Sequence, residues 1–204
     1  METKKALIFF LLYFIFSPVG AQTVALKTEG QDPQYVETIK GRAQKIVDGL
    51  QLTDAKKAEN VRNIIANRYF LLNDIHAKYD KSQQDALQAE LYKHHFELAS
   101  ALALYLNEEQ IDAVKDGMTY GRLKRDYNAQ LEMIPTLTEE EKAQILIWLK
   151  EAREYAMDAA DSKGKHFWFD KYRGRTNNWL SARGYDLKKE RDEWMKRIDN
   201  AKKK

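Results

Sequence analysis

The feature that most constrains the fold is the spacing of apolar residues, which recur at intervals of three and four through most of the chain. This spacing places them on one face of an α-helix, whereas a half-buried strand would alternate apolar and polar residues. No useful run of such alternation occurs, and the chain contains only three prolines. The sequence therefore predicts an all-α protein, an irregular bundle of six to eight helices.

Polar capping residues divide the periodic stretches into separate helices. N-caps are expected at Asp32, Thr53, Asn107, Thr138 and Asp186, because Asp, Asn and Thr side chains accept hydrogen bonds from the first free backbone N–H groups. Asn107 and Thr138 are followed three residues later by Gln110 and Glu141, the pattern of a reciprocal capping box. The helices are expected near 33–49, 53–79, 87–105, 107–117, 123–133, 138–161 and 187–201.

The helical pattern is interrupted between Ser162 and Tyr185. Six aromatic residues alternate there with six lysines and arginines, and three glycines and an asparagine pair punctuate the stretch. We expect an irregular aromatic/basic loop segment before the last helix, and we interpret it as the working surface of the protein. The alternative is a buried plug, with aromatic rings in the core and arginines paired to nearby acids.

The composition of this segment suits a carbohydrate ligand. Sugars present apolar C–H faces that can lie on aromatic rings, and their hydroxyl groups need planar amide and guanidinium partners. A uronate carboxylate would suit the bidentate fork of an arginine. The candidate ligand-binding residues are Trp168, Tyr172, Arg173, Arg175, Asn177, Asn178, Trp179 and Arg183.

The N-terminus has the features of a secretory signal peptide. Lys4 and Lys5 precede an uncharged apolar run over 6–16, and small residues lead up to Ala21. The apolar run is shorter than the ~20 residues of a membrane span. We expect cleavage after Ala21, a flexible leader over 22–31 and a single helical domain over 32–204. The protein should be periplasmic or secreted, with no membrane attachment after cleavage.

Charge and composition exclude several functional classes. The chain has 34 lysines and arginines against 31 aspartates and glutamates, a near-neutral balance that argues against nucleic-acid binding. It contains no cysteine, so disulfides, thiol nucleophiles and cysteine metal ligands are excluded. His94 and His95 are adjacent and diverge by about 100° on a helix. We expect no metal site and no cofactor.

No catalytic motif is present, and no catalytic residue is assigned. A Gly-x-Ser-x-Gly nucleophile elbow is missing. A carboxylate pair such as Asp158 or Asp161 with Asp170 stays open as a glycosidase-like arrangement. The sequence favours a protein that is not an enzyme.

Several stretches resemble a known family. LTDAKKAENVRNIIANRY and KYRGRTNNWLSARGY, together with the signal peptide, are similar to exported proteins of unknown function from polysaccharide-degrading Gram-negative bacteria. The resemblance extends from about Val36 to Arg191. That family carries a provisional sugar-binding label, so the resemblance implies an exported helical domain that binds carbohydrate.

Together these observations predict an exported, non-catalytic carbohydrate-binding protein associated with polysaccharide utilisation. Acidic oligosaccharides are candidate ligands, and the protein is expected to be a monomer or weak dimer. The helix starts Leu106-Asn107-Glu108-Glu109-Gln110 and Leu137-Thr138-Glu139-Glu140-Glu141 are similar to the Leu-Thr-x-x-Gln starts of small periplasmic helical chaperones and metal-stress sensors. This resemblance implies an alternative, a periplasmic helical chaperone or stress adaptor. A glycan-active enzyme is the second alternative.

Overall fold

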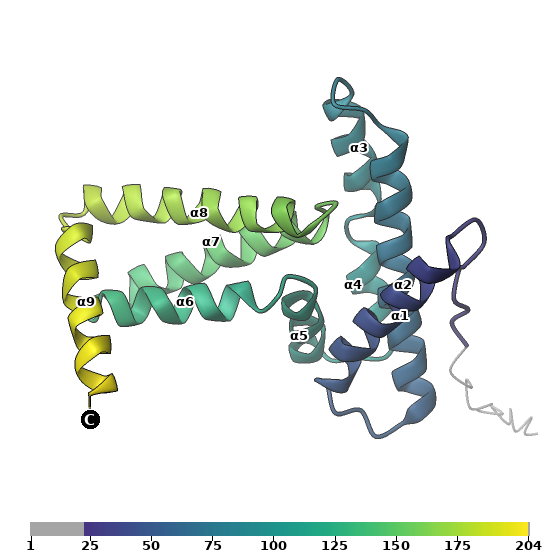
Figure 1. The fold of residues 1–204 in the computed structure, drawn as a ribbon, viewed down its shortest axis with the longest axis horizontal. Coiled ribbons are helices and arrows are strands. Elements are labelled where there is room, and N and C mark those ends of the chain that lie inside the picture. Colours follow the sequence, from purple (N-terminus) through teal and green to yellow (C-terminus); the bar gives the residue numbers. More distant parts are fainter. Residues whose placement is uncertain (1–22, 204) are drawn as a thin grey trace, which may run out of the picture.

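The computed structural model describes residues 23–203, and every regular element in that range is an α-helix (Figure 1). The predicted signal peptide over 1–21 lies outside the described residues. Over 23–203 no helix has both the length and the apolar character to cross a membrane. The helices are α1 (Pro33–Asp48), α2 (Ala55–Lys78), α3 (Gln84–His94), α4 (Glu97–Leu102), α5 (Glu108–Met118), α6 (Arg122–Met133), α7 (Glu139–Met157), α8 (Ser162–Ala182) and α9 (Leu187–Lys202).

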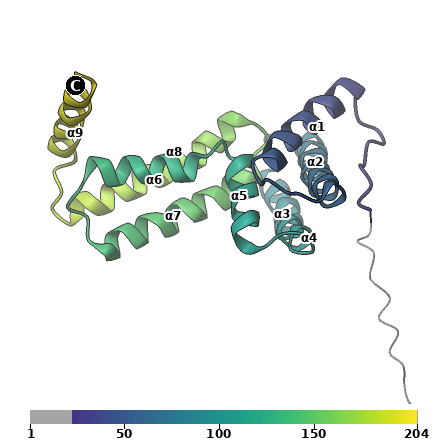
Figure 2. The ribbon, with the colours of Figure 1, turned by 90° about the horizontal axis from the view of Figure 1, so that it is seen from below.

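The predicted all-α bundle is confirmed. His95 and Phe96 alone separate α3 from α4, so these two form one interrupted helix where the sequence predicted a continuous one. The molecule is elongated, with α1 to α4 at one end and α6 to α8 side by side at the other (Figures 1 and 2). α5 lies at the junction, and α9 crosses the far ends of α6 to α8.

Each end of the molecule has its own apolar core. The core of α1, α2, α4 and α5 includes the fully buried Ile39 and Ile65. The core of α6, α7 and α8 includes Ile145 and Phe169, and burying such a side chain contributes about 1.5–3 kcal/mol. Met157, the last residue of α7, belongs to the first core. Apolar packing at Met157 therefore joins the two ends.

The prediction of an irregular loop before the last helix is wrong, because this segment folds as α8. Asp161 caps the helix by accepting a hydrogen bond from the Gly164 backbone N–H at 2.7 Å. The buried face has helical spacing and consists of Lys165, Phe169, Tyr172, Thr176 and Leu180. Gly184, at a φ of 97°, lies just after the C-cap of α8.

The capping predictions are confirmed at four of five helices. The side chains of Asp32, Asn107, Thr138 and Asp186 all accept hydrogen bonds from the first turns that follow them. The prediction that Thr53 caps α2 is wrong. Asp54 caps this helix instead, accepting from the Lys57 N–H at 3.0 Å.

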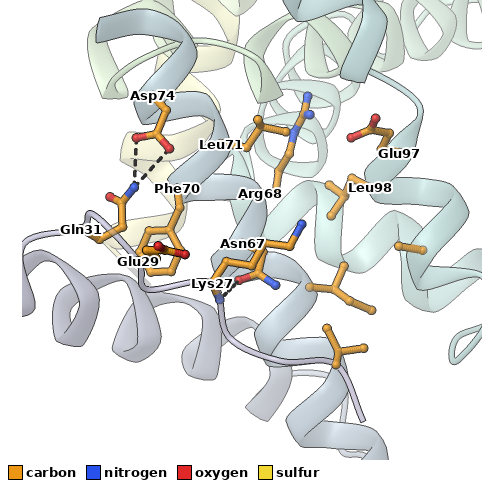
Figure 3. Close-up of a pocket in the computed structure, with 13 residues that line it drawn as sticks. Lys27, Glu29, Gln31, Asn67, Arg68, Phe70, Leu71, Asp74, Glu97 and Leu98 are labelled. Carbon is orange, nitrogen blue, oxygen red and sulfur yellow. Dashed lines mark hydrogen bonds between the residues drawn. The ribbon is translucent and has the colours of Figure 1, made fainter. Parts of the chain in front are cut away.

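The segment that precedes α1 lies along α2 (Figure 3). Its backbone is hydrogen-bonded by an asparagine ladder: Asn60 and Asn63 contact Val24, and Asn67 contacts Ala25 and Lys27, over distances of 2.8–2.9 Å. Gln31 donates to the Asp74 carboxylate at 3.0 Å. The polar composition of residues 22–31 does not predict that this segment packs against α2. The segment forms one wall of a cavity of about 370 Å³ against α2 and α4.

Candidate functional site

The helical geometry of α8 divides the predicted ligand-binding residues among different faces. Residues turn by about 100° per position around a helix. Five of the predicted residues lie on the side toward α7: Trp168, Tyr172, Arg175, Trp179 and Arg183. Arg173 and Asn177 line a cavity between α8 and α9. Asn178 is exposed. The set therefore does not form one surface.

The five residues toward α7 are engaged with the protein itself. Cations lie over aromatic rings in three pairs, at centroid distances of 4.8, 4.7 and 4.3 Å: Lys171 over Trp168, Arg175 over Trp148, and Arg183 over Trp179. Tyr155 stacks on Trp168 at 4.6 Å, and Tyr172 is buried. For this group the geometry favours packing, because one face of each tryptophan already contacts a cation.

A more open aromatic surface lies beside this group, where the two ends of the molecule meet. α3 and the last turns of α7 enclose a cleft of about 540 Å³, which we call the seam cleft. Its aromatic lining is Tyr92, Phe96 and Tyr155, and its ionisable lining is His95, Glu151, Glu154 and Asp158.

The aromatic side chains of the seam cleft are unusually exposed. Tyr92 is 71% exposed, Phe96 62% and Tyr155 46%. Tyr92 and Phe96 meet edge to face at 6.0 Å, and Tyr155 continues the surface onto Trp168 of α8. Aromatic side chains of this size are mostly buried in soluble proteins. A cluster of exposed rings around a cleft is therefore a candidate binding surface.

Asp158 organises the polar end of the seam cleft. Its carboxylate accepts hydrogen bonds from Arg68 and from His95 Nδ1, the latter at 2.6 Å. Its backbone carbonyl lies 2.7 Å from His76 Nε2. The Arg68 side chain is only 3% exposed and also donates to the His94 carbonyl. These contacts hold the end of α7 against α2 and α3, and they fix the His95 ring at the cleft.

The hydrogen bond to Asp158 raises the pKa of His95, and burial of the ring opposes this effect. His95 Nε2 lies 3.7 Å from the Glu154 carboxylate. The imidazole is therefore held between two carboxylates, with Nδ1 committed to Asp158.

The two glutamates of the cleft also have cationic neighbours. Lys115 Nζ donates to both oxygens of Glu154 at 3.0 Å. Glu151 lies 3.5 Å from Arg175. Burial, together with a hydrogen bond to Glu151, raises the pKa of Tyr172. The carboxylates of the cleft are thus positioned hydrogen-bond acceptors whose charge is largely balanced.

None of the aromatic residues that line the seam cleft was among the predicted ligand-binding residues. They come from stretches about sixty residues apart, over 92–96 and 151–158, which only tertiary packing brings together. One signal was present in the sequence. Tyr92 and Phe96 are four residues apart and lie off the apolar stripe that contains Leu87, Leu91 and Leu98.

Comparison with known proteins places the chain in a family. A family profile matches residues 36–86 and 79–200, and the family is described as a protein of unknown function (DUF3826). The resemblance to an uncharacterised family is confirmed at this level. A comparison with curated proteins finds no match. Because the matched ranges cover most of the chain, this protein belongs to the DUF3826 family of proteins of unknown function.

Proposed function

We propose that this protein binds carbohydrate in the seam cleft without transforming it. The observation that carries the proposal is the presence of three exposed aromatic side chains, Tyr92, Phe96 and Tyr155, on one cleft that also presents carboxylates and a histidine. The cleft volume of about 540 Å³ lies within the range of roughly 300–1,000 Å³ that is common for small-molecule sites.

The chemistry of the cleft matches the two kinds of surface on a sugar. An apolar ring face can stack on Tyr92, Phe96 or Tyr155, each of which keeps a large exposed area. Hydroxyl groups can donate to Glu151 and Glu154, whose positions are fixed by Arg175 and Lys115. The described residues that line this cleft include no lysine or arginine that could pair with a carboxylate, so the cleft favours a neutral sugar over a uronate.

A binding role accounts for the cleft better than glycoside hydrolysis does. Hydrolysis requires one carboxyl group that is protonated and can donate to the leaving group. Each cleft carboxylate is instead paired with a cation: Glu151 with Arg175, Glu154 with Lys115, and Asp158 with Arg68. The N-terminal sequence over 1–21 supports export, so we place the binding in the periplasm or outside the cell, in polysaccharide utilisation.

Calorimetric titration of the protein with a panel of neutral oligosaccharides tests the proposal. Tyr92→Ala and Phe96→Ala remove exposed rings, so both variants should fold normally. Each should weaken binding about tenfold, as expected for the loss of one stacking contact. Leu104→Ala is the matched control, because Leu104 is 80% exposed and does not line the seam cleft.

Binding heat with at least one neutral oligosaccharide, reduced in both ring variants and unchanged in the control, would support the proposal. The proposal fails if no neutral oligosaccharide binds, or if the ring variants bind as the wild type does. Two further assays cover the other functional classes. Protection of a denatured client protein that depends on Tyr92 and Phe96 would favour a chaperone, and release of reducing ends would indicate an enzyme.

A further inference from the structure

A second cavity lies where α6, α7, α8 and α9 meet. It has a volume of about 490 Å³, and we call it the α8–α9 pocket. Its floor is apolar, with the buried side chains of Met133, Ile145 and Leu149. Its polar lining includes Gln130, Arg173, Asn177 and Arg191, and Trp194 adds a half-buried aromatic ring.

Donor groups without acceptors converge on this pocket. Over residues 23–203, neither the Arg191 nor the Asn177 side chain has a hydrogen-bond or ion-pair partner. The Gln130 Nε2 atom is buried and also has no partner within the described chain. A buried amide donor that lacks an acceptor is unfavourable, so most folded proteins satisfy such groups. A ligand with acceptor oxygens would supply what these three side chains lack.

The charge around the α8–α9 pocket favours an anion. The one acidic residue that lines it, Asp126, is already engaged: Arg122 donates to its Oδ2 at 2.8 and 3.0 Å, and Arg125 to its Oδ1 at 3.0 Å. Among the described residues, Arg173 pairs only with Asp170, in an exposed ion pair at 3.3 Å, a weak kind of interaction. Arg173 and Arg191 therefore leave the pocket with an unbalanced positive charge.

We propose that the α8–α9 pocket binds an organic carboxylate whose body is a ring or short apolar chain. The guanidinium groups of Arg173 and Arg191 would both donate to the carboxylate. Gln130 and Asn177 would donate to further oxygens, and Trp194 with the apolar floor would contact the body of the ligand. A uronic acid is one carboxylate of this class. The site is separate from the seam cleft, so the inference does not rest on carbohydrate binding there.

The binding should also affect α9. This helix contributes Arg191 and Trp194 to the pocket, yet none of its residues is fully buried. Within residues 23–203, the side-chain hydrogen bonds from α9 to the rest of the fold are those that Arg197 donates to the Glu132 and Met133 carbonyls, at 2.7 and 3.2 Å. A ligand that spans Arg191 on α9 and Arg173 on α8 would hold the two helices together.

Titration with D-galacturonate tests the inference, with D-galactose as the uncharged counterpart. Arg173→Gln and Arg191→Gln should each weaken galacturonate binding about tenfold or more, as expected for a lost charge-assisted pair. Arg175→Gln is the matched control. Arg175 is on the same helix and is 54% exposed against 60% for Arg173, but it lies toward α7. Hydrogen exchange of α9 should slow when galacturonate is saturating.

Equal binding by Arg173→Gln and Arg175→Gln would overturn the inference, and so would the absence of galacturonate binding. Titration with inorganic sulfate and with phosphate is the second arm of the experiment. Binding of these ions without galacturonate would replace the carboxylate assignment with a simple oxyanion site. Tyr92→Ala should leave galacturonate binding unchanged, which keeps a failure at this pocket distinct from a failure at the seam cleft.

Discussion

Replacement of Gly174 by alanine should stabilise the protein, because Gly174 lies in the interior of α8. Glycine in a helix interior is less favourable than alanine by about 1 kcal/mol, since it loses more backbone freedom on folding. Within the part of the chain that the structure describes, a Cβ atom at Gly174 would meet no heavy atom within 4 Å beyond its two sequence neighbours and the local helix backbone. The gain in helix stability should therefore not be offset by crowding.

Urea denaturation of Gly174→Ala should show a free energy of unfolding about 1 kcal/mol above that of the wild type. For a chain of this size the melting temperature should rise by about 2–4 °C. Gly41→Ala in α1 is a positive control, because a Cβ there also meets nothing within 4 Å. Gly117→Ala in α5 is the opposite case. Its Cβ would lie 3.1 and 3.2 Å from two carbons of Ile46, so this variant should lose stability.

The control at Gly41 makes the result decisive. If Gly41→Ala gains stability and Gly174→Ala does not, then Gly174 is not in a helix interior in solution. The aromatic/basic segment would then be the irregular loop that its sequence suggested. A gain at both positions, with an unchanged dependence on urea concentration, would establish α8 as helix.

Two further predictions concern buried charged groups near the seam. Asp158→Asn should reduce the free energy of unfolding by about 3–5 kcal/mol, because it leaves the buried Arg68 guanidinium without its carboxylate. A loss below about 1 kcal/mol in urea denaturation would contradict the buried ion pair between Arg68 and Asp158. Burial lowers the pKa of Lys165 from its ordinary value of 10.5 to about 8. Between pH 8 and 10.5 the unfolded chain therefore binds more protons at Lys165 than the folded chain does. As the pH rises through this range, the free energy of unfolding of the wild type should increase relative to that of Lys165→Met. Equal pH dependence in the two proteins would refute this assignment.

Most helices could be predicted from the sequence because their signals are local. The capping boxes of Asn107 with Gln110 and of Thr138 with Glu141 each depend on residues within one helical turn. The apolar stripes of α1 and α7 have the same short range. Such signals do not require knowledge of which helices become neighbours.

The helix α8 could not be predicted in this way, because two polar residues occupy its buried face. Lys165 is buried because its Nζ donates to the Met118 carbonyl at 2.8 Å and lies over the rings of Tyr69 and Tyr120. Tyr69 belongs to α2, Met118 is the last residue of α5, and Tyr120 lies between α5 and α6. Thr176 is also buried. Without these partners, a lysine and a threonine on the buried face break the apolar periodicity, so the sequence predicts an interruption from Ser162 onward.

The prediction of a loop in place of α8 also led to a wrong grouping of residues in the candidate site. In a loop, Arg173 and Arg175 could share one ligand, and both were predicted to do so. In a helix, residues two apart are related by a rotation of about 200° about the helix axis, so their side chains point to nearly opposite sides. Arg175 accordingly lies over Trp148 on the α7 side, and Arg173 lines the α8–α9 pocket. Two arginines of similar exposure on one helix thus have different surroundings: Arg175 packs on a tryptophan, and Arg173 lines the pocket for which we propose a carboxylate ligand.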